Sequence, residues 1–93
     1  MDALTPDETT TNPIRAHRQR KGLTANEVGV AIEVTGGLVS IWERGELFPP
    51  DRRLRDLARL LGIDEVRLRS DLTEFRAGLT RRVHEKLAAV TTA

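Results

Sequence analysis

Few residues in this 93-residue chain are of types that support catalysis, and their spacing does not assemble a reaction centre. His17 and His84 are far apart with no third ligand near either, and cysteine is absent. A metal site needs several such ligands together, and a disulfide framework needs cysteines. Ser40 lacks a base that would activate it, and the carboxylates alternate with arginines as on a solvated surface. The sequence therefore predicts no catalytic residue, no metal and no cofactor, and hence no enzyme and no small-molecule ligand.

Positive charge is gathered in particular segments, although the formal net charge is only +1. Residues 1–12 carry three acids and no base, whereas residues 13–24 carry four bases and no acid. Residues 25–50 carry four acids and one arginine, and residues 51–93 carry ten bases and seven acids. Basic segments of this kind are typical of contact with nucleic-acid phosphates, with an ordinary solvated face as the alternative.

Helices are the elements expected to position these residues. The chain has three aromatic residues (one Trp and two Phe) among many Leu, Ala, Arg and Glu, a composition that favours helix over sheet. No apolar run approaches the roughly 18 residues of a membrane span, and the N-terminus lacks the basic start and apolar stretch of a signal peptide. We expect a small all-α domain in the cytoplasm, with no membrane partner.

Helix boundaries can be predicted from capping residues. Asn12 followed by Pro13 is a helix start, and Thr24 with Glu27 forms a capping box. Thr35 is the expected N-cap of the third helix, and glycines are expected to end several helices. The predicted helices are 13–21, 24–32, 36–44, 51–61 and a last one that begins at residue 65.

The last predicted helix carries a regular apolar stripe. Its apolar residues recur at steps of three or four, which places them on one helix face. They are Leu72, Phe75, Leu79, Val83, Leu87 and Val90. The other helices hold enough Leu to close a core, so we interpret the stripe as a homodimer interface. Packing of the stripe back onto its own chain is the alternative.

The segments 24–32 and 35–44 have the dimensions of a helix-turn-helix, two helices joined by a short turn. With their flanks they read IRAHRQRKGLT, TANEVGVAI, VTGGLVSIWERGELFPP and LRDLARLLGI. In order and spacing these segments resemble the Cro/C1 (XRE-type) family of transcriptional regulators over about 50 residues. Trp-Glu-Arg-Gly, followed by Pro49 and a Leu-rich helix, is the most specific part of the match.

The resemblance implies a compact five-helix bundle with a C-terminal helical extension, whose third helix enters the major groove of double-stranded DNA. The residues that would face bases are Thr35, Gly36, Gly37, Leu38, Ser40 and Ile41. Those that would contact phosphates are Arg18, Thr24, Ala25, Asn26, Arg44, Arg52 and Arg53. Arg18 and Glu43 occupy positions that often form an ion pair in this family, while Val34, Val39 and Trp42 look like core residues.

The chain also departs from the family pattern. Ala25 stands where the family usually has Gln, and Glu33 stands where the turn usually has Gly. The expected reading face has no Gln, Asn, Lys or Arg before Arg44, although bidentate base readout relies on such side chains. We therefore expect either A/T-rich or shape-dependent recognition, or base contacts from elsewhere on the protein.

The expected domain layout is a disordered tail over residues 1–12, a helix-turn-helix domain over 13–63 and a dimerisation helix over 64–90. The predicted function is a DNA-binding regulator, a repressor in the first interpretation, that acts as a homodimer on a palindromic operator. The alternative is a helix-turn-helix module that binds a protein partner, as an antitoxin, an anti-repressor or an adaptor would. The net charge of −3 over residues 25–50 and the apolar side chains of Leu38 and Ile41 favour that alternative.

Overall fold

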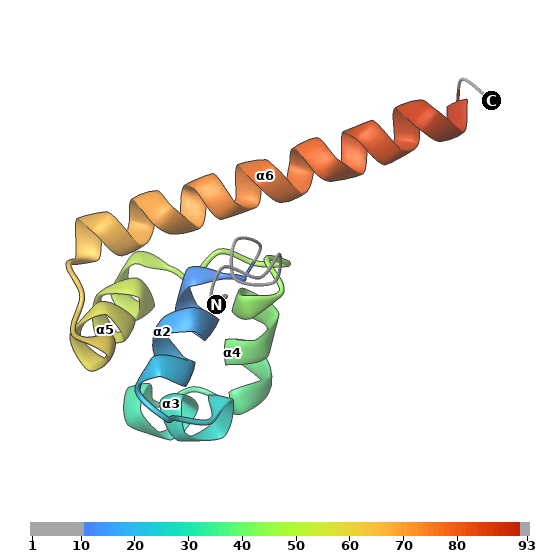
Figure 1. The fold of residues 1–93 in the computed structure, drawn as a ribbon. Helices are drawn as coiled ribbons and strands as arrows, with labels where there is room; N and C mark the ends of the chain where they lie inside the picture. The colour runs from blue at the N-terminus through green and yellow to red at the C-terminus, as the bar shows by residue number, and fades with distance from the viewer. Residues whose placement is uncertain (1–10, 92–93) are drawn as a thin grey trace, which may run out of the picture.

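The structure, a computed structural model, describes residues 11–91, and in this range the chain forms five helices and no strand. The helices are α2 (Pro13–Arg20), α3 (Ala25–Ile32), α4 (Gly36–Glu43), α5 (Asp51–Leu61) and α6 (Glu65–Thr91). Figure 1 shows α2 to α5 as a compact group with α6 lying across one side of it. The all-α prediction is confirmed, and each predicted helix boundary lies within one residue of the observed one. The predicted tail falls almost entirely outside the described residues.

The bundle begins at Asn12, which the predicted tail had included. Its side-chain oxygen accepts a hydrogen bond from the backbone N–H of Ile14 at 2.8 Å and caps α2 as expected. Its amide nitrogen donates to the backbone oxygen of Trp42 at 3.2 Å. Asn12 is buried, and its second hydrogen bond joins the start of α2 to the end of α4. The ordered domain therefore includes this residue.

Helices α3 and α4 approach each other closely at a glycine. A Cβ atom at Gly29 would lie 2.6 Å from the carbonyl oxygen of Val34 and 3.0 Å from the backbone nitrogen of Gly36. A side chain at Gly29 would therefore force the two helices apart. Glu33, which caps the C-terminus of α3, has φ +65°, a conformation that costs an L-residue energy and that glycine adopts freely.

The core is aliphatic around a single tryptophan. Its buried members come from all five helices: Ile14, Val28, Ile32, Val39, Trp42, Leu54, Leu57, Ala58, Leu68 and Leu72. Val34, expected in the core, is partly buried against this cluster. Leu68 and Leu72 belong to α6, so the first turns of that helix close the bundle. The packed core thus extends beyond residue 63, where the helix-turn-helix domain was expected to end.

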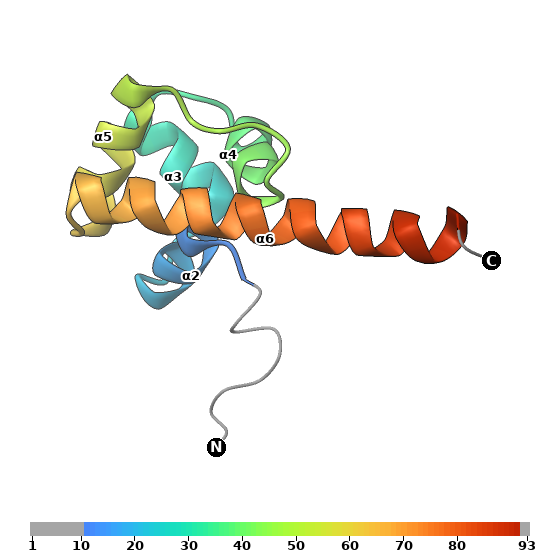
Figure 2. The ribbon, with the colours of Figure 1, turned by 90° about the horizontal axis from the view of Figure 1, so that it is seen from above.

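Helix α6 is longer than the bundle that it covers. It has 27 residues, which at 1.5 Å per residue span about 40 Å. Figure 2 shows its first half over α5 and α2 and its second half extending past the bundle. Every side chain from Arg81 to Val90 is exposed. Within the described range, no helix combines the length and the apolar content needed to cross a membrane.

Candidate nucleic-acid interface

Helix α4 has one buried and one accessible face. Val39 and Trp42 point into the core. The opposite face is formed by residues at spacings of three and four: Gly37, Ser40, Ile41 and Arg44. On this face Gly37 and Arg44 are exposed, and the other two are half-buried. Thr35 caps the helix by accepting a hydrogen bond from the N–H of Leu38 at 3.1 Å. This face offers one hydroxyl, one apolar side chain, one guanidinium and a stretch of bare backbone.

Two of the residues predicted to face bases are packed against other parts of the bundle. A Cβ atom on Gly36 would collide with the side-chain oxygen of Asn26 in α3, so the side of α4 at Gly36 is already covered. Leu38 is partly buried against the core. A helical period of 3.6 residues turns both positions away from the Gly37–Arg44 face. The other four predicted residues lie on the accessible side of this segment: Thr35, Gly37, Ser40 and Ile41.

The N-terminus of α3 presents two backbone amides. The hydroxyl of Thr24 accepts from the N–H of Glu27 at 3.0 Å, and the carboxylate of Glu27 accepts from the N–H of Thr24 at 2.8 Å. This reciprocal box consumes two of the donors that a helix start leaves open. In the part of the chain that the structure describes, the N–H groups of Ala25 and Asn26 have no acceptor. They are the donors available to an anion here.

Arg18 is held by a two-pronged ion pair and a backbone contact. Its Nε and one terminal nitrogen donate to the two carboxylate oxygens of Glu43 at 2.7 and 3.0 Å. The other terminal nitrogen donates to the carbonyl of Leu23 at 2.9 Å. The side chains of Arg18 and Glu43 are only 13% and 8% exposed, and the hydrogen bond to Glu43 raises the pKa of Arg18. The predicted ion pair is present, and it leaves Arg18 little freedom to reach a phosphate.

Arg44 is exposed and paired with an equally exposed acid. Its Nε donates to Glu46 at 2.7 Å, with both side chains more than half exposed. The hydrogen bond from Arg44 lowers the pKa of Glu46 and raises that of Arg44. Such surface pairs are weak, so a phosphate can replace the carboxylate at low cost.

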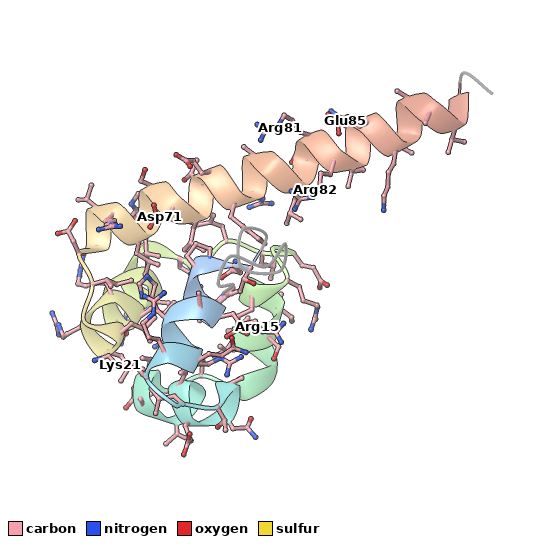
Figure 3. The ribbon with its side chains drawn as sticks, in the orientation of Figure 1. Arg15, Lys21, Asp71, Arg81, Arg82 and Glu85 are labelled. Atoms are coloured by element: carbon pink, nitrogen blue, oxygen red, sulfur yellow. The ribbon has the colours of Figure 1, made fainter. Side chains whose placement is uncertain are left out.

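Arg15, in the basic segment 13–24, is a further basic residue of this surface. It is exposed, and with Arg18, Ser40, Glu43 and Arg44 it lines a depression of about 320 Å³ between α2 and α4. Figure 3 shows Arg15 on the side of α2 that faces α4, and Lys21 at the other end of that helix. The acid-free segment 13–24 signalled a basic helix, but only the packing of α2 against α4 identifies which side chain lies beside Arg44.

The two arginines predicted to contact phosphates from α5 differ in accessibility. Arg53 donates to the carbonyl oxygen of Ile32 at 2.8 Å and lies 3.8 Å from Asp56. It therefore stabilises the C-terminus of α3, where carbonyl groups lack partners. Arg52 is exposed, and the described residues provide no ion pair for it. Of the two, Arg52 is the one available to a ligand.

The predicted dimer stripe divides into three parts. Leu72 is 3% exposed and lies in the core of its own chain, so this residue is not available to a partner. Phe75 and Leu79 are half-buried over the end of α4, where Leu79 is close to Gly45. Val83, Leu87 and Val90 are 52%, 55% and 72% exposed. Only this last part is an uncovered apolar surface.

The two histidines lie apart, and no three His, Asp or Glu side chains among residues 11–91 are grouped to hold a metal ion. His17 lines a surface depression together with Arg20, Leu61 and Gly62. Burial lowers the pKa of His17, and the positive charge of Arg20 lowers it further. The imidazole is therefore largely neutral at pH 7.

Comparison with known proteins identifies the family. Residues 14–72 match the family described as a helix-turn-helix domain. The chain belongs to this family. The family is part of the Cro/C1 (XRE-like) group of helix-turn-helix proteins, which confirms the resemblance noted in the sequence. No curated protein and no solved structure matches the chain. The family match ends at residue 72, the last core residue of α6, and leaves the projecting half of α6 outside.

Membership in the helix-turn-helix family makes DNA binding the expected activity and a regulator the expected class of protein. In such domains the second helix of the motif occupies the major groove, and the first lies across the backbone. Here these helices are α4 and α3.

Proposed function

We propose that this protein is a transcriptional repressor that binds a palindromic operator as a homodimer and blocks access of polymerase to the DNA. The observation that carries the proposal is the accessible face of α4, Gly37 to Arg44, beside the open amides at the start of α3. Both belong to a helix-turn-helix family domain. Phosphate contacts set the register, and the α4 face meets the base edges.

Affinity in this proposal comes mainly from phosphate contacts. The amides of Ala25 and Asn26 bind one phosphate at the positive end of the α3 dipole. Arg44 exchanges Glu46 for a phosphate, and Arg15 contacts the same strand from the neighbouring helix. Arg52 provides a further contact from the start of α5. Neutralising phosphates releases condensed counterions, so binding weakens steeply as salt is raised.

Base recognition in this proposal is sparse and depends on close approach. Gly37 lets the backbone of α4 come near the groove floor because it has no side chain. Ile41 meets thymine methyl groups, and the hydroxyls of Ser40 and Thr35 each provide one hydrogen bond. With no amide or basic side chain before Arg44, discrimination relies on A/T-rich sequence and on the ease with which the DNA deforms.

A homodimer provides more DNA contacts than one such surface can make. Two copies double the phosphate contacts, and a two-fold axis matches half-sites about 34 Å apart. The uncovered apolar end of α6 supports a dimer because exposed apolar surface of this kind is typical of interfaces.

Fluorescence anisotropy with labelled random duplex, at about 50 and 200 mM salt, tests DNA binding. We expect binding that weakens by orders of magnitude across this range. Arg44→Ala should reduce the slope of log affinity against log salt by about 1, as expected for one lost phosphate contact. Arg67→Ala is the matched control, because Arg67 is an exposed arginine of α6 that takes no part in the proposed contacts.

Absence of binding to duplex at the lower salt, by a folded chain, would overturn the proposal. An equal change of slope for Arg44→Ala and Arg67→Ala would show that binding does not use the α4 face. Arg18→Ala is not suited to this test, because loss of the Arg18–Glu43 pair also affects folding.

The alternative, a protein-interaction module on α4, is less well supported than the sequence indicated. Leu38, one of the two apolar residues that favoured it, packs against the core. Ile41 is then the remaining apolar side chain on the accessible face. A protein partner whose binding survives Arg44→Ala, in a chain that does not bind duplex DNA, would favour this alternative.

A further inference from the structure

The apolar face of α6 continues from the bundle into solvent, with one basic residue, Lys86, in line with Leu68 on the same face. Leu68, Leu79 and Val90 are spaced by 11 residues, as are Leu72 and Val83. An 11-residue spacing is 3.67 residues per turn, close to a straight α-helix, so all five lie on nearly the same face. The bundle buries the first part of this face, and Val83, Leu87 and Val90 lie beyond it. The uncovered residues are thus the extension of a packing surface.

A depression lies where the bundle stops covering this face. It has a volume of about 280 Å³ and is lined by Gly45, Arg76, Leu79, Thr80, Val83 and His84. Gly45 has φ +77°, and a Cβ atom there would lie 2.5 Å from Leu79. The side chains of Leu79 and Phe75 on α6 therefore pack directly against the backbone of Gly45, just beyond α4. The depression opens directly onto the exposed side chain of Val83.

We propose that the distal half of α6 pairs antiparallel with the same segment of a second copy, and that the partner's Val90 fills the depression beside Gly45. One chain carries both the apolar ridge and the depression that receives it, which is the condition for a self-complementary two-fold contact. With the axis between Val83 and Leu87, Leu79 lies within one residue of the level of the partner's Val90. This arrangement specifies the interface of the homodimer in the proposed function and rests on that part of it.

Charge and size favour the antiparallel direction over a parallel one. Figure 3 shows Arg82 on the side of α6 that faces the bundle, and Arg81 and Glu85 on the opposite side. Arg82 therefore borders the apolar face. In a parallel pair it would lie level with the partner's Arg82, and like charges would be opposed. In the antiparallel pair it lies level with the partner's Ala88, whose small side chain leaves room for the guanidinium.

Sedimentation velocity on the DNA-free full chain tests the interface separately from DNA binding. We expect the wild-type chain to dimerise and Leu87→Glu to weaken the dimer by more than about tenfold, because it buries a charge in an apolar contact. Ala77→Glu is the matched control: Ala77 is exposed and lies on the opposite face of the same helix. Both variants should keep the helix content and unfolding midpoint of the dilute wild-type chain, because neither residue is in the core.

Engineered cysteines test the direction, since the chain has no cysteine of its own. We expect a mixture of Leu79→Cys and Val90→Cys chains to form a mixed disulfide, and Val90→Cys alone to form little. Faster disulfide formation by Val90→Cys alone would overturn the antiparallel arrangement.

Several outcomes would overturn the interface itself. One is a wild-type chain that stays monomeric, and another is an equal effect of Leu87→Glu and Ala77→Glu. A monomer that binds anionic phospholipid vesicles through Leu87 would assign the stripe to lipid instead. A dimer that persists when duplex DNA does not bind would support this inference and contradict the proposed function, so the two can fail separately.

Discussion

The two halves of α6 share one helix and one apolar period, yet they have opposite environments. Leu68 and Leu72 are 0% and 3% exposed, whereas Leu87 and Val90 are more than half exposed. The first pair lies over α2 and α5, and the second pair lies past the end of the bundle (Figure 2). Burial of an apolar side chain therefore depends on what the tertiary structure places beneath it, and the helical period alone specifies only the face.

A similar contrast separates two arginine–glutamate pairs of the bundle. The Arg18–Glu43 ion pair has two hydrogen bonds and is almost buried, whereas the Arg44–Glu46 ion pair is exposed. The buried pair joins α2 to α4 and is structural. The exposed pair is available for exchange with a ligand, just as the exposed half of α6 is available to a partner. In both cases the side chains packed inside the bundle contribute to the fold, and similar side chains outside it stay exposed.

The largest expected effect comes from truncating the buried half of α6. Leu68→Ala should lower the free energy of unfolding by about 2–5 kcal/mol, because it removes fully buried methyl groups and leaves a cavity. Leu87→Ala, the matched substitution in the projecting half, should change it by less than about 0.5 kcal/mol. Urea unfolding followed by circular dichroism, at concentrations low enough to give a monomer, measures both. Equal losses would show that the two halves are packed alike.

An intermediate effect is expected from the two ion pairs. Glu43→Ala should cost about 2–3 kcal/mol of stability, because it leaves the guanidinium of Arg18 largely buried without its counter-charge. Glu46→Ala should cost less than about 1 kcal/mol, as for an exposed pair. The same unfolding measurement compares them. A loss for Glu46→Ala as large as that for Glu43→Ala would remove the distinction between a structural and an exchangeable pair.

The smallest effect concerns strain in the turn between α3 and α4. Glu33→Gly should raise the unfolding free energy by about 1 kcal/mol, since glycine adopts the positive φ of this position without the cost that a Cβ imposes. Glu33→Ala removes the carboxylate but keeps the Cβ, and should not stabilise the chain. If both variants stabilise it equally, the effect comes from the charge of Glu33 and not from its backbone conformation.

Much of the fold could be predicted because it depends on neighbours in the sequence. The caps at Asn12, Thr24 and Thr35 act over two or three residues, and the helix period follows from local spacing. The Arg18–Glu43 pair could be expected only through the family resemblance, because the two residues are 25 positions apart.

The site was harder to predict because it depends on how helices are rotated and packed. Three contacts exist only because a second helix is packed nearby. Arg53 caps α3, Asn26 contacts Gly36, and Leu38 packs against the core. Arg15 became part of the site for the same reason. These contacts between helices cannot be predicted from composition and residue spacing.

The sequence by itself determined the helices, their caps, the helix-turn-helix spacing and the single apolar face of α6, because hydrogen bonding and side-chain periodicity along a helix are local. Only the tertiary structure decided that Leu72 closes the core while Val83 to Val90 remain uncovered, and that Arg18 is confined while Arg44 is accessible. Those outcomes depend on where the bundle ends and which helices meet, since burial and charge pairing arise between surfaces that are distant in the chain.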